Sequence, residues 1–132
     1  ILGKTLYETK NVMFMGGSRI TMRAIQYLPS NLNIKIIEQN RERAEKLVEI
    51  TPSNVTIFLG DARDAELLLT EGISEMDAFI ALTGNSEANI LGCMMAKQYG
   101  VKKTIAEVEN IDYIAMAERF DIGTIKNKKQ NR

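Results

Sequence analysis

A pair of glycines, Gly16 and Gly17, follows the apolar residues 11–15 and precedes a segment with helical periodicity. In a tight turn from a strand into a helix, the first backbone N–H groups of the helix have no partner inside it. The helix dipole also favours negative charge at that end, so such a turn can hold a phosphate. We therefore expect Gly16, Gly17, Ser18, Arg19 and Ile20 to surround a pyrophosphate.

The turn matches the dinucleotide-binding fingerprint G-x-G-x-x-G only in part. Gly16 occupies the first position, whereas Ser18 and Thr21 replace the second and third glycines. Ser18 adds a Cβ atom where the backbone should approach a phosphate, and Thr21 adds β-branched bulk where helix and strand should pack. Gly17 offers partial compensation. Taken alone the pattern is weak evidence, because many α/β proteins contain such a turn and bind no nucleotide.

An acidic residue, Glu38, closes the apolar run 34–37 at about the distance from the turn that the fingerprint requires, roughly 20 positions. At the end of a second strand, its carboxylate could accept both hydroxyls of an adenosine ribose. Because a carboxylate repels a 2′-phosphate, Glu38 favours NAD or ATP over NADP. The alternative interpretation is an ordinary solvated strand end.

Composition excludes several classes of function. The chain has 132 residues, is 45% hydrophobic, and carries 17 basic and 17 acidic residues, which argues against a nucleic-acid partner or an anionic membrane held by bulk charge. With no histidine, it lacks Ser-His-Asp and Cys-His catalysis and any Cys/His metal site. Cys93, among apolar residues, is expected to be a buried, inert thiol. We see no membrane span or secretory signal, and expect a cytoplasmic protein.

The length suits one domain with a single hydrophobic core. We expect residues 1–10 to be a linker, residues 11–125 the domain, and residues 126–132 a polar basic tail. Because the chain begins with Ile1 rather than Met and ends in that tail, we interpret it as a fragment of a longer protein.

Apolar runs and helical spacings alternate through the domain. Strands are predicted at residues 11–15, 33–38, 55–59, 77–82, 103–108 and, cut short, 123–125; helices are predicted at 19–28, 40–50, 65–71, 86–99 and 110–120. Asn40, Asp64 and Asn110 are expected as N-caps, and Gly72 and Gly100 as helix ends. The spacings suggest helix faces formed by Ile20, Ala24, Ile25 and Leu28, by Ala44, Leu47 and Val48, and by Ala88, Leu91, Met95 and Tyr99.

This alternation, with nearly continuous apolar strands, predicts a doubly wound, Rossmann-like α/β domain with a parallel sheet in the order 3-2-1-4-5-6, the sixth strand truncated. A ligand should lie over the carboxyl ends of strands one and four, where the order reverses. The polar residues that fall at or just beyond strand ends are Arg19, Glu38, Asp61, Thr83, Asn85, Glu87 and Glu107.

Several short segments carry a likeness to a known family: residues 12–20, 35–38 with 43–45 after them, 59–62, 77–83, 87–91 and 96–97. Together they resemble the nucleotide-binding half of RCK (regulator of potassium conductance) domains, most of all the TrkA type of bacterial Trk potassium-uptake systems. The likeness covers about residues 11–125. It implies a regulatory domain, not an enzyme, that senses NAD(H) or ATP/ADP, forms a homo-oligomer (dimers and a ring), and acts peripherally at the inner face of the cell membrane on a potassium-translocating membrane subunit.

Carried over by position, the resemblance assigns Gly16 and Gly17 to the phosphate loop, Arg19 to a position beside the phosphates, and Glu38 to the ribose. It further assigns Asp61 and Ala62 to the turn that borders the adenine. The loop after the fourth strand is assigned to Thr83, Gly84, Asn85 and Glu87, with Asn89 in the same block. TrkA proteins carry two tandem copies of this domain, and the residues in these segments resemble the second copy more than the first.

Local alternatives remain open for several of these residues. Arg19 could face water, Asp61 could be a turn former, and Thr83, Asn85 and Glu87 could serve to cap a helix. Glu107 could be an exposed strand end. Two other functions also remain open: a fragment of an NAD-dependent oxidoreductase, and a degenerate copy that serves only in assembly, for which Ser18 and Thr21 are the evidence.

Overall fold

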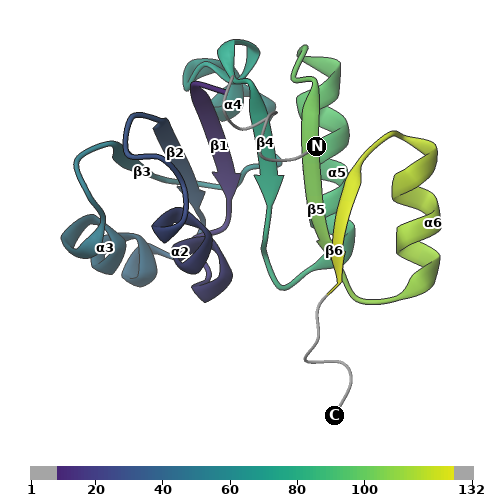
Figure 1. Ribbon diagram of the computed structural model, residues 1–132, viewed down its shortest axis with the longest axis horizontal. Coiled ribbons are helices and arrows are strands. Elements are labelled where there is room, and N and C mark those ends of the chain that lie inside the picture. Colours follow the sequence, from purple (N-terminus) through teal and green to yellow (C-terminus); the bar gives the residue numbers. More distant parts are fainter. Residues whose placement is uncertain (1–8, 127–132) are drawn as a thin grey trace.

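A computed structural model describes residues 9–126. Strands and helices alternate along the chain (Figure 1). The strands are β1 (Asn11–Met15), β2 (Asn33–Glu38), β3 (Val55–Leu59), β4 (Ala78–Ala81), β5 (Lys103–Val108) and β6 (Gly123–Lys126). The helices are α2 (Arg19–Gln26), α3 (Arg41–Ile50), α4 (Ala65–Thr70), the 3₁₀ turn η1 (Ile73–Glu75), α5 (Ser86–Gln98) and α6 (Ile111–Arg119). None of the described helices is long and apolar enough to cross a membrane.

The strands form one parallel sheet in the order β3-β2-β1-β4-β5-β6, which confirms the doubly wound fold. β6 pairs with β5 from Gly123 opposite Ile105 to Lys126 opposite Val108. Lys126, expected in the tail, is therefore the last strand residue, and residues 127–132 of that tail lie outside the described part. Of the expected linker, Thr9 is buried and the N–H of Lys10 donates to Asp77.

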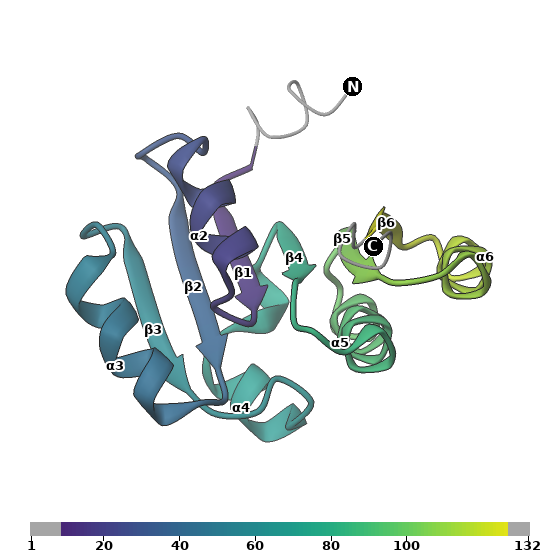
Figure 2. The ribbon, with the colours of Figure 1, turned by 90° about the horizontal axis from the view of Figure 1, so that it is seen from below.

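Two hydrophobic layers enclose the sheet. On one face, Phe14 and Ile36 pack with Ile25 of α2 and Leu47 of α3. On the other face, Phe79 of β4 belongs to a cluster with side chains of α4, α5 and α6, namely Leu68, Cys93 and Ala117. The helices thus flank both sides of the strands (Figure 2). Cys93 is buried, as expected, and this burial raises the pKa of its thiol to about 12.

A polar side chain caps each α-helix at the residue before its first turn. The side-chain oxygens of these residues accept backbone N–H groups of the first turn: Ser18, Asn40, Asp64, Asn85 and Asn110. The expected caps at Asn40, Asp64 and Asn110 are confirmed. Because each helix follows a parallel strand, all these caps lie toward the carboxyl edge of the sheet. Gly72 and Gly100 adopt positive φ angles at helix ends, as expected.

Some predicted helix faces are wrong. In α2, Ile20 is 40% exposed and Thr21 is buried instead. In α3, Val48 is 63% exposed, because it lies one residue, or about 100°, from the buried Leu47. In α5, Leu91 is 45% exposed, and the face against the sheet is formed by Asn89, Ile90, Cys93 and Ala96. The sequence spacing allowed either face, and contact with the strands selected one.

Candidate functional site

The turn between β1 and α2 needs both of its glycines, for different reasons. Gly16 has a φ angle of +97°, a conformation that L side chains rarely adopt, and its N–H donates to the carbonyl of Ile37 at 2.9 Å. Gly17 has no such angle, but a Cβ atom there would collide with the side chain of Leu47 and lie 3.3 Å from Glu38 Oε1. The backbone of this turn therefore lies directly against α3 and the end of β2.

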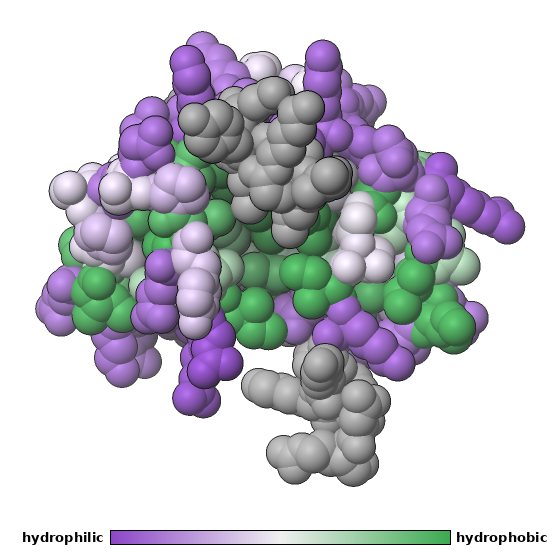
Figure 3. Space-filling model, in the orientation of Figure 1, coloured by the Kyte–Doolittle hydropathy of each residue, from purple (hydrophilic) through white to green (hydrophobic). Residues whose placement is uncertain are grey.

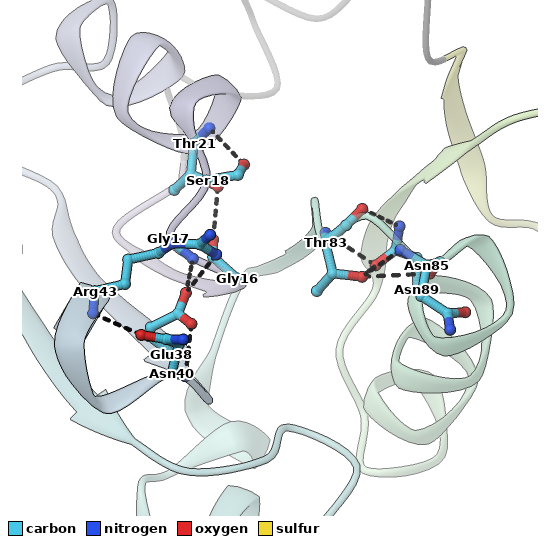
Figure 4. A network of polar contacts seen from close by, with 10 residues as sticks. All are labelled: Gly16, Gly17, Ser18, Thr21, Glu38, Asn40, Arg43, Thr83, Asn85 and Asn89. Carbon is cyan, nitrogen blue, oxygen red and sulfur yellow. Dashed lines mark hydrogen bonds and ion pairs between the residues drawn. The ribbon is translucent and has the colours of Figure 1, made fainter. Parts of the chain in front are cut away.

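Ser18 and Thr21, the two departures from the fingerprint, both take part in the hydrogen bonds of this turn. Ser18 has an ordinary φ angle of −74°, and its hydroxyl accepts the N–H of Thr21 as the cap of α2. Thr21 is fully buried, and its Oγ1 donates to the carbonyl of Gly16 at 2.6 Å (Figure 4). The β-branched side chain is therefore packed against the turn and tied to it by a hydrogen bond, without the expected crowding of the helix.

Glu38 joins the glycine turn to the start of α3. Its Oε1 accepts the N–H of Gly17 at 2.7 Å, and its Oε2 accepts the N–H of Asn40 at 2.8 Å. The Nη1 atom of Arg43 lies 3.7 Å from the same Oε1. Glu38 is only 3% exposed, so the interpretation as a solvated strand end is wrong. A carboxylate has about four lone-pair positions, so roughly two remain for the hydroxyls of a ribose.

A cavity of about 370 Å³ opens at the carboxyl edge of the sheet, between the ends of the adjacent strands β1 and β4. At this point the strand order reverses: β2 and β3 follow on one side, and β5 and β6 on the other. The position of the cavity is the one that the strand order predicts for a ligand. Six predicted site residues line it: Gly16, Ser18, Glu38, Ala62, Thr83 and Gly84. The other lining residues were not predicted: Met15, Ile37, Gln39, Asn40, Arg43, Gly60 and Leu82. The apolar members suit a flat base, whereas the loop N–H groups and Glu38 suit phosphate and ribose.

The remaining predicted site residues do not line the cavity. Gly17 lies behind it with its N–H bonded to Glu38, and Arg19 and Ile20 are exposed at the start of α2. Asp61 is paired with Arg63, whose guanidinium donates to both carboxylate oxygens at 2.9 and 3.1 Å. These hydrogen bonds lower the pKa of Asp61.

Asn85, Glu87 and Glu107 lie at the start of α5 or at the end of β5. Asn85 caps α5, and Glu87 accepts the phenol of Tyr113 on α6 at 2.8 Å, which raises the pKa of Tyr113. Glu107 is buried rather than exposed, and its carbonyl accepts the side-chain amide of Asn89. These residues therefore stabilise the loop and the helix beside the cavity.

Thr83 is held in the cavity wall by Asn89, a fully buried side chain of α5 (Figure 4). Asn89 Oδ1 accepts the N–H and the hydroxyl of Thr83 at 3.1 and 2.6 Å. Its Nδ2 donates to the carbonyls of Thr83 and Glu107 at 3.1 and 2.8 Å. The loop after β4 is thus fixed to both α5 and β5. The methyl group of Thr83 faces Gly16, since a Cβ atom at Gly16 would lie 2.9 Å from Thr83 Cγ2.

The lining of the cavity supplies groups that can bind a nucleotide. Among the described residues, no group of three or more acidic, cysteine or histidine side chains could hold a metal ion. Backbone N–H groups, one carboxylate and one guanidinium surround an apolar floor. Such groups can orient a nucleotide through hydrogen bonds and ion pairing.

Comparison with known proteins gives consistent matches. The model of the TrkA-N domain family matches residues 12–127. The chain is 39% identical over 109 residues to the Trk system potassium uptake protein TrkA of Vibrio alginolyticus, and 35% identical over 109 residues to that of Haemophilus influenzae. Each match covers 83% of this chain and 24% of the relative. The chain thus spans about a quarter of the length of these relatives.

Solved structures share the fold. The TrkA-N domain of the inner membrane protein ybaL from Escherichia coli superimposes with a TM-score of 0.78 at 17% identity, covering 93% of this chain and 91% of that one. The GsuK channel bound to NAD superimposes with a TM-score of 0.75 at 18% identity, covering 89% of this chain and 21% of that one.

Proposed function

Because the chain belongs to the TrkA-N domain family, we propose that it is the nucleotide-sensing regulatory domain of a potassium-uptake system. The observation that carries the proposal is the cavity whose wall is formed by Glu38, bonded to the N–H of Gly17, at the edge where the strand order reverses. The names of the TrkA relatives support the transport role. The potassium-translocating membrane subunit would be its partner, at the cytoplasmic face of the membrane.

The proposed ligand is NAD(H), with ATP or ADP as the alternative. Glu38 would accept the ribose hydroxyls, and the turn from Gly16 to Ser18 would hold the phosphates at the N-terminus of α2, where Arg19 is the first helical residue. Gly60 and Ala62 would border the adenine. The NAD-bound GsuK channel supports the choice of NAD only through a shared fold.

Binding would regulate by population shift, without a chemical step. A ligand that prefers one arrangement of assembled domains stabilises that arrangement, and coupling of about 1–3 kcal/mol changes a partner's equilibrium 5- to 150-fold. A homo-oligomer would provide these arrangements. Its support here is the apolar outer surface of α5 and α6, where Leu91, Met116 and Phe120 are each more than 40% exposed. Sedimentation of the chain with and without NADH would measure the assembly.

Calorimetric titration with NAD⁺, NADH, ATP and ADP tests the proposal directly. We expect saturable binding by at least one of them, a Kd raised at least about tenfold by Glu38→Gln, and no change for Glu45→Gln, an exposed glutamate on α3. Silence from every ligand up to millimolar concentrations would contradict sensing and favour a copy that serves only in assembly. Turnover of NADH with a cosubstrate would favour an oxidoreductase.

A further inference from the structure

The wall of the cavity that holds Glu38 also holds a cation, Arg43. The two side chains come from different elements, the end of β2 and the first turn of α3, and their charged atoms lie 3.7 Å apart. The side chain of Glu38 is 4% exposed, whereas that of Arg43 is 55% exposed. The carboxylate is therefore recessed, and the guanidinium stands at the mouth of the cavity.

These two side chains are the only ionisable ones among the described residues that line the cavity, so their formal charges cancel. Glu38 alone predicts rejection of a phosphate on the ribose, because a 2′-phosphate carries a charge of about −2 near pH 7. With Arg43 beside Glu38, a 2′-phosphate would face one positive and one negative side chain of the cavity wall. The electrostatic argument against a 2′-phosphate is then much weaker.

The guanidinium of Arg43 also has donors to spare. Within the described part of the chain its contact with Glu38 is an ion pair of 3.7 Å, longer than a hydrogen bond, and it makes no hydrogen bond there. The backbone N–H of Arg43 is held by the cap Asn40 at 2.8 Å, which fixes the start of the side chain over the cavity. A planar fork of free N–H groups on a fixed base is well suited to bind a phosphate with two hydrogen bonds.

We infer that Arg43 makes the cavity accept adenosine phosphorylated at the 2′ position, so that NADP(H) binds as well as NAD(H). The inference rests on the proposed function, because it concerns the same site. The ribose 3′-hydroxyl would donate to a free lone pair of Glu38. The 2′-phosphate would lie beside Glu38 and accept N–H groups of Arg43, near the unpaired backbone N–H groups at the N-terminus of α3.

Titration of the 132-residue chain with NADH and with NADPH tests this inference. We expect the two Kd values to agree within about tenfold. Arg43→Gln should raise the Kd of NADPH about tenfold and that of NADH less than about threefold, because only NADPH loses a charge-assisted hydrogen bond. Higher ionic strength should weaken NADPH more than NADH. The control is Arg41→Gln, which removes the same charge from an exposed position of α3 outside the cavity lining.

Four outcomes would overturn the inference. NADH could bind while NADPH is rejected more than about a hundredfold, which leaves the proposed function intact. Arg43→Gln could weaken both ligands equally, or Arg41→Gln could have the same effect as Arg43→Gln. If neither dinucleotide binds while the melting curve shows a folded chain, the NAD(P) site itself is wrong, and with it this inference.

Discussion

The carboxylate of Glu38 lies 2.7 Å from the backbone nitrogen of Gly17, a residue 21 positions earlier in the chain. The bond joins the end of β2 to the turn after β1, and the second oxygen of Glu38 joins the start of α3. Since both oxygens accept buried or half-buried N–H groups, the residue stabilises the cavity wall before any ligand arrives.

Replacement of Glu38 should therefore cost stability as well as binding. Glu38→Gln keeps the size of the side chain, but its NH₂ group cannot accept an N–H, so the amide of either Gly17 or Asn40 loses its partner. We expect a loss of about 1–3 kcal/mol in the free energy of unfolding, measured by urea denaturation. An unchanged midpoint would show that these bonds contribute nothing to stability. Glu45→Gln is the control.

Gly17→Ala should destabilise the chain although Gly17 has no positive φ angle. The new methyl group would collide with Leu47, and relief of this contact requires a shift of a core side chain. Overpacking of this kind costs about 1–3 kcal/mol. The matched control is Gly84→Ala, where no atom lies within 4 Å of the new methyl group, so its unfolding free energy should stay close to wild type. Equal effects of the two substitutions would contradict the packing argument.

Thr21→Val should test the hydrogen bond that ties α2 to the turn. Valine keeps the branched shape but removes the hydroxyl that donates to the buried carbonyl of Gly16, at a cost of about 1–2 kcal/mol. Thr56→Val at an exposed position of β3 should change stability by less than about 0.5 kcal/mol. We also expect Thr21→Gly to weaken the turn rather than to restore nucleotide affinity. Tighter binding by Thr21→Gly would show that Thr21 obstructs the phosphate.

Asp77 predicts a dependence of stability on acid pH. Its Oδ2 accepts the N–H groups of Asn11 and Lys10 at 2.9 and 2.8 Å, and these bonds lower its pKa below the ordinary value of 3.8. Because the pKa is lower in the folded state, the stabilisation is present above pH 3.8 and is lost as the pH falls through the folded-state value. The difference in unfolding free energy between wild type and Asp77→Asn should therefore shrink below about pH 4. A constant difference down to pH 2 would contradict this assignment.

Much of the fold follows from local signals in the sequence. Strand positions, three helix caps and two glycine helix ends agree with the structure, because each depends on a few neighbouring residues. The orientation of helices was harder to predict. Val48 and Leu91 belong to apolar spacings but face outward, since the neighbouring residues Leu47 and Ile90 are the ones that contact the sheet layers.

The candidate site was predictable where the fingerprint or the family resemblance marked it. Gly16, Ser18 and Glu38 belong to the fingerprint, and all line the cavity. Arg43 was not predicted as a site residue, and Asn89 was named only as a member of a block of the resemblance, although both lie in helices that begin just after a predicted strand end. That position is the signal that could have found them, because the first turn of each such helix faces the carboxyl edge of the sheet.

By itself, the sequence determined the alternation of strands and helices, the strand order, and the edge where a ligand would lie, because these depend on periodicity, capping and the rules of parallel sheets. Only the tertiary structure decided what Glu38, Thr21 and Arg43 do. Glu38 contacts Gly17, 21 positions earlier, whereas Thr21 and Arg43 contact Gly16 and Glu38, each five positions earlier and outside the helix of its partner. Such contacts depend on how elements are placed within a few ångströms of one another, and no local pattern specifies that distance.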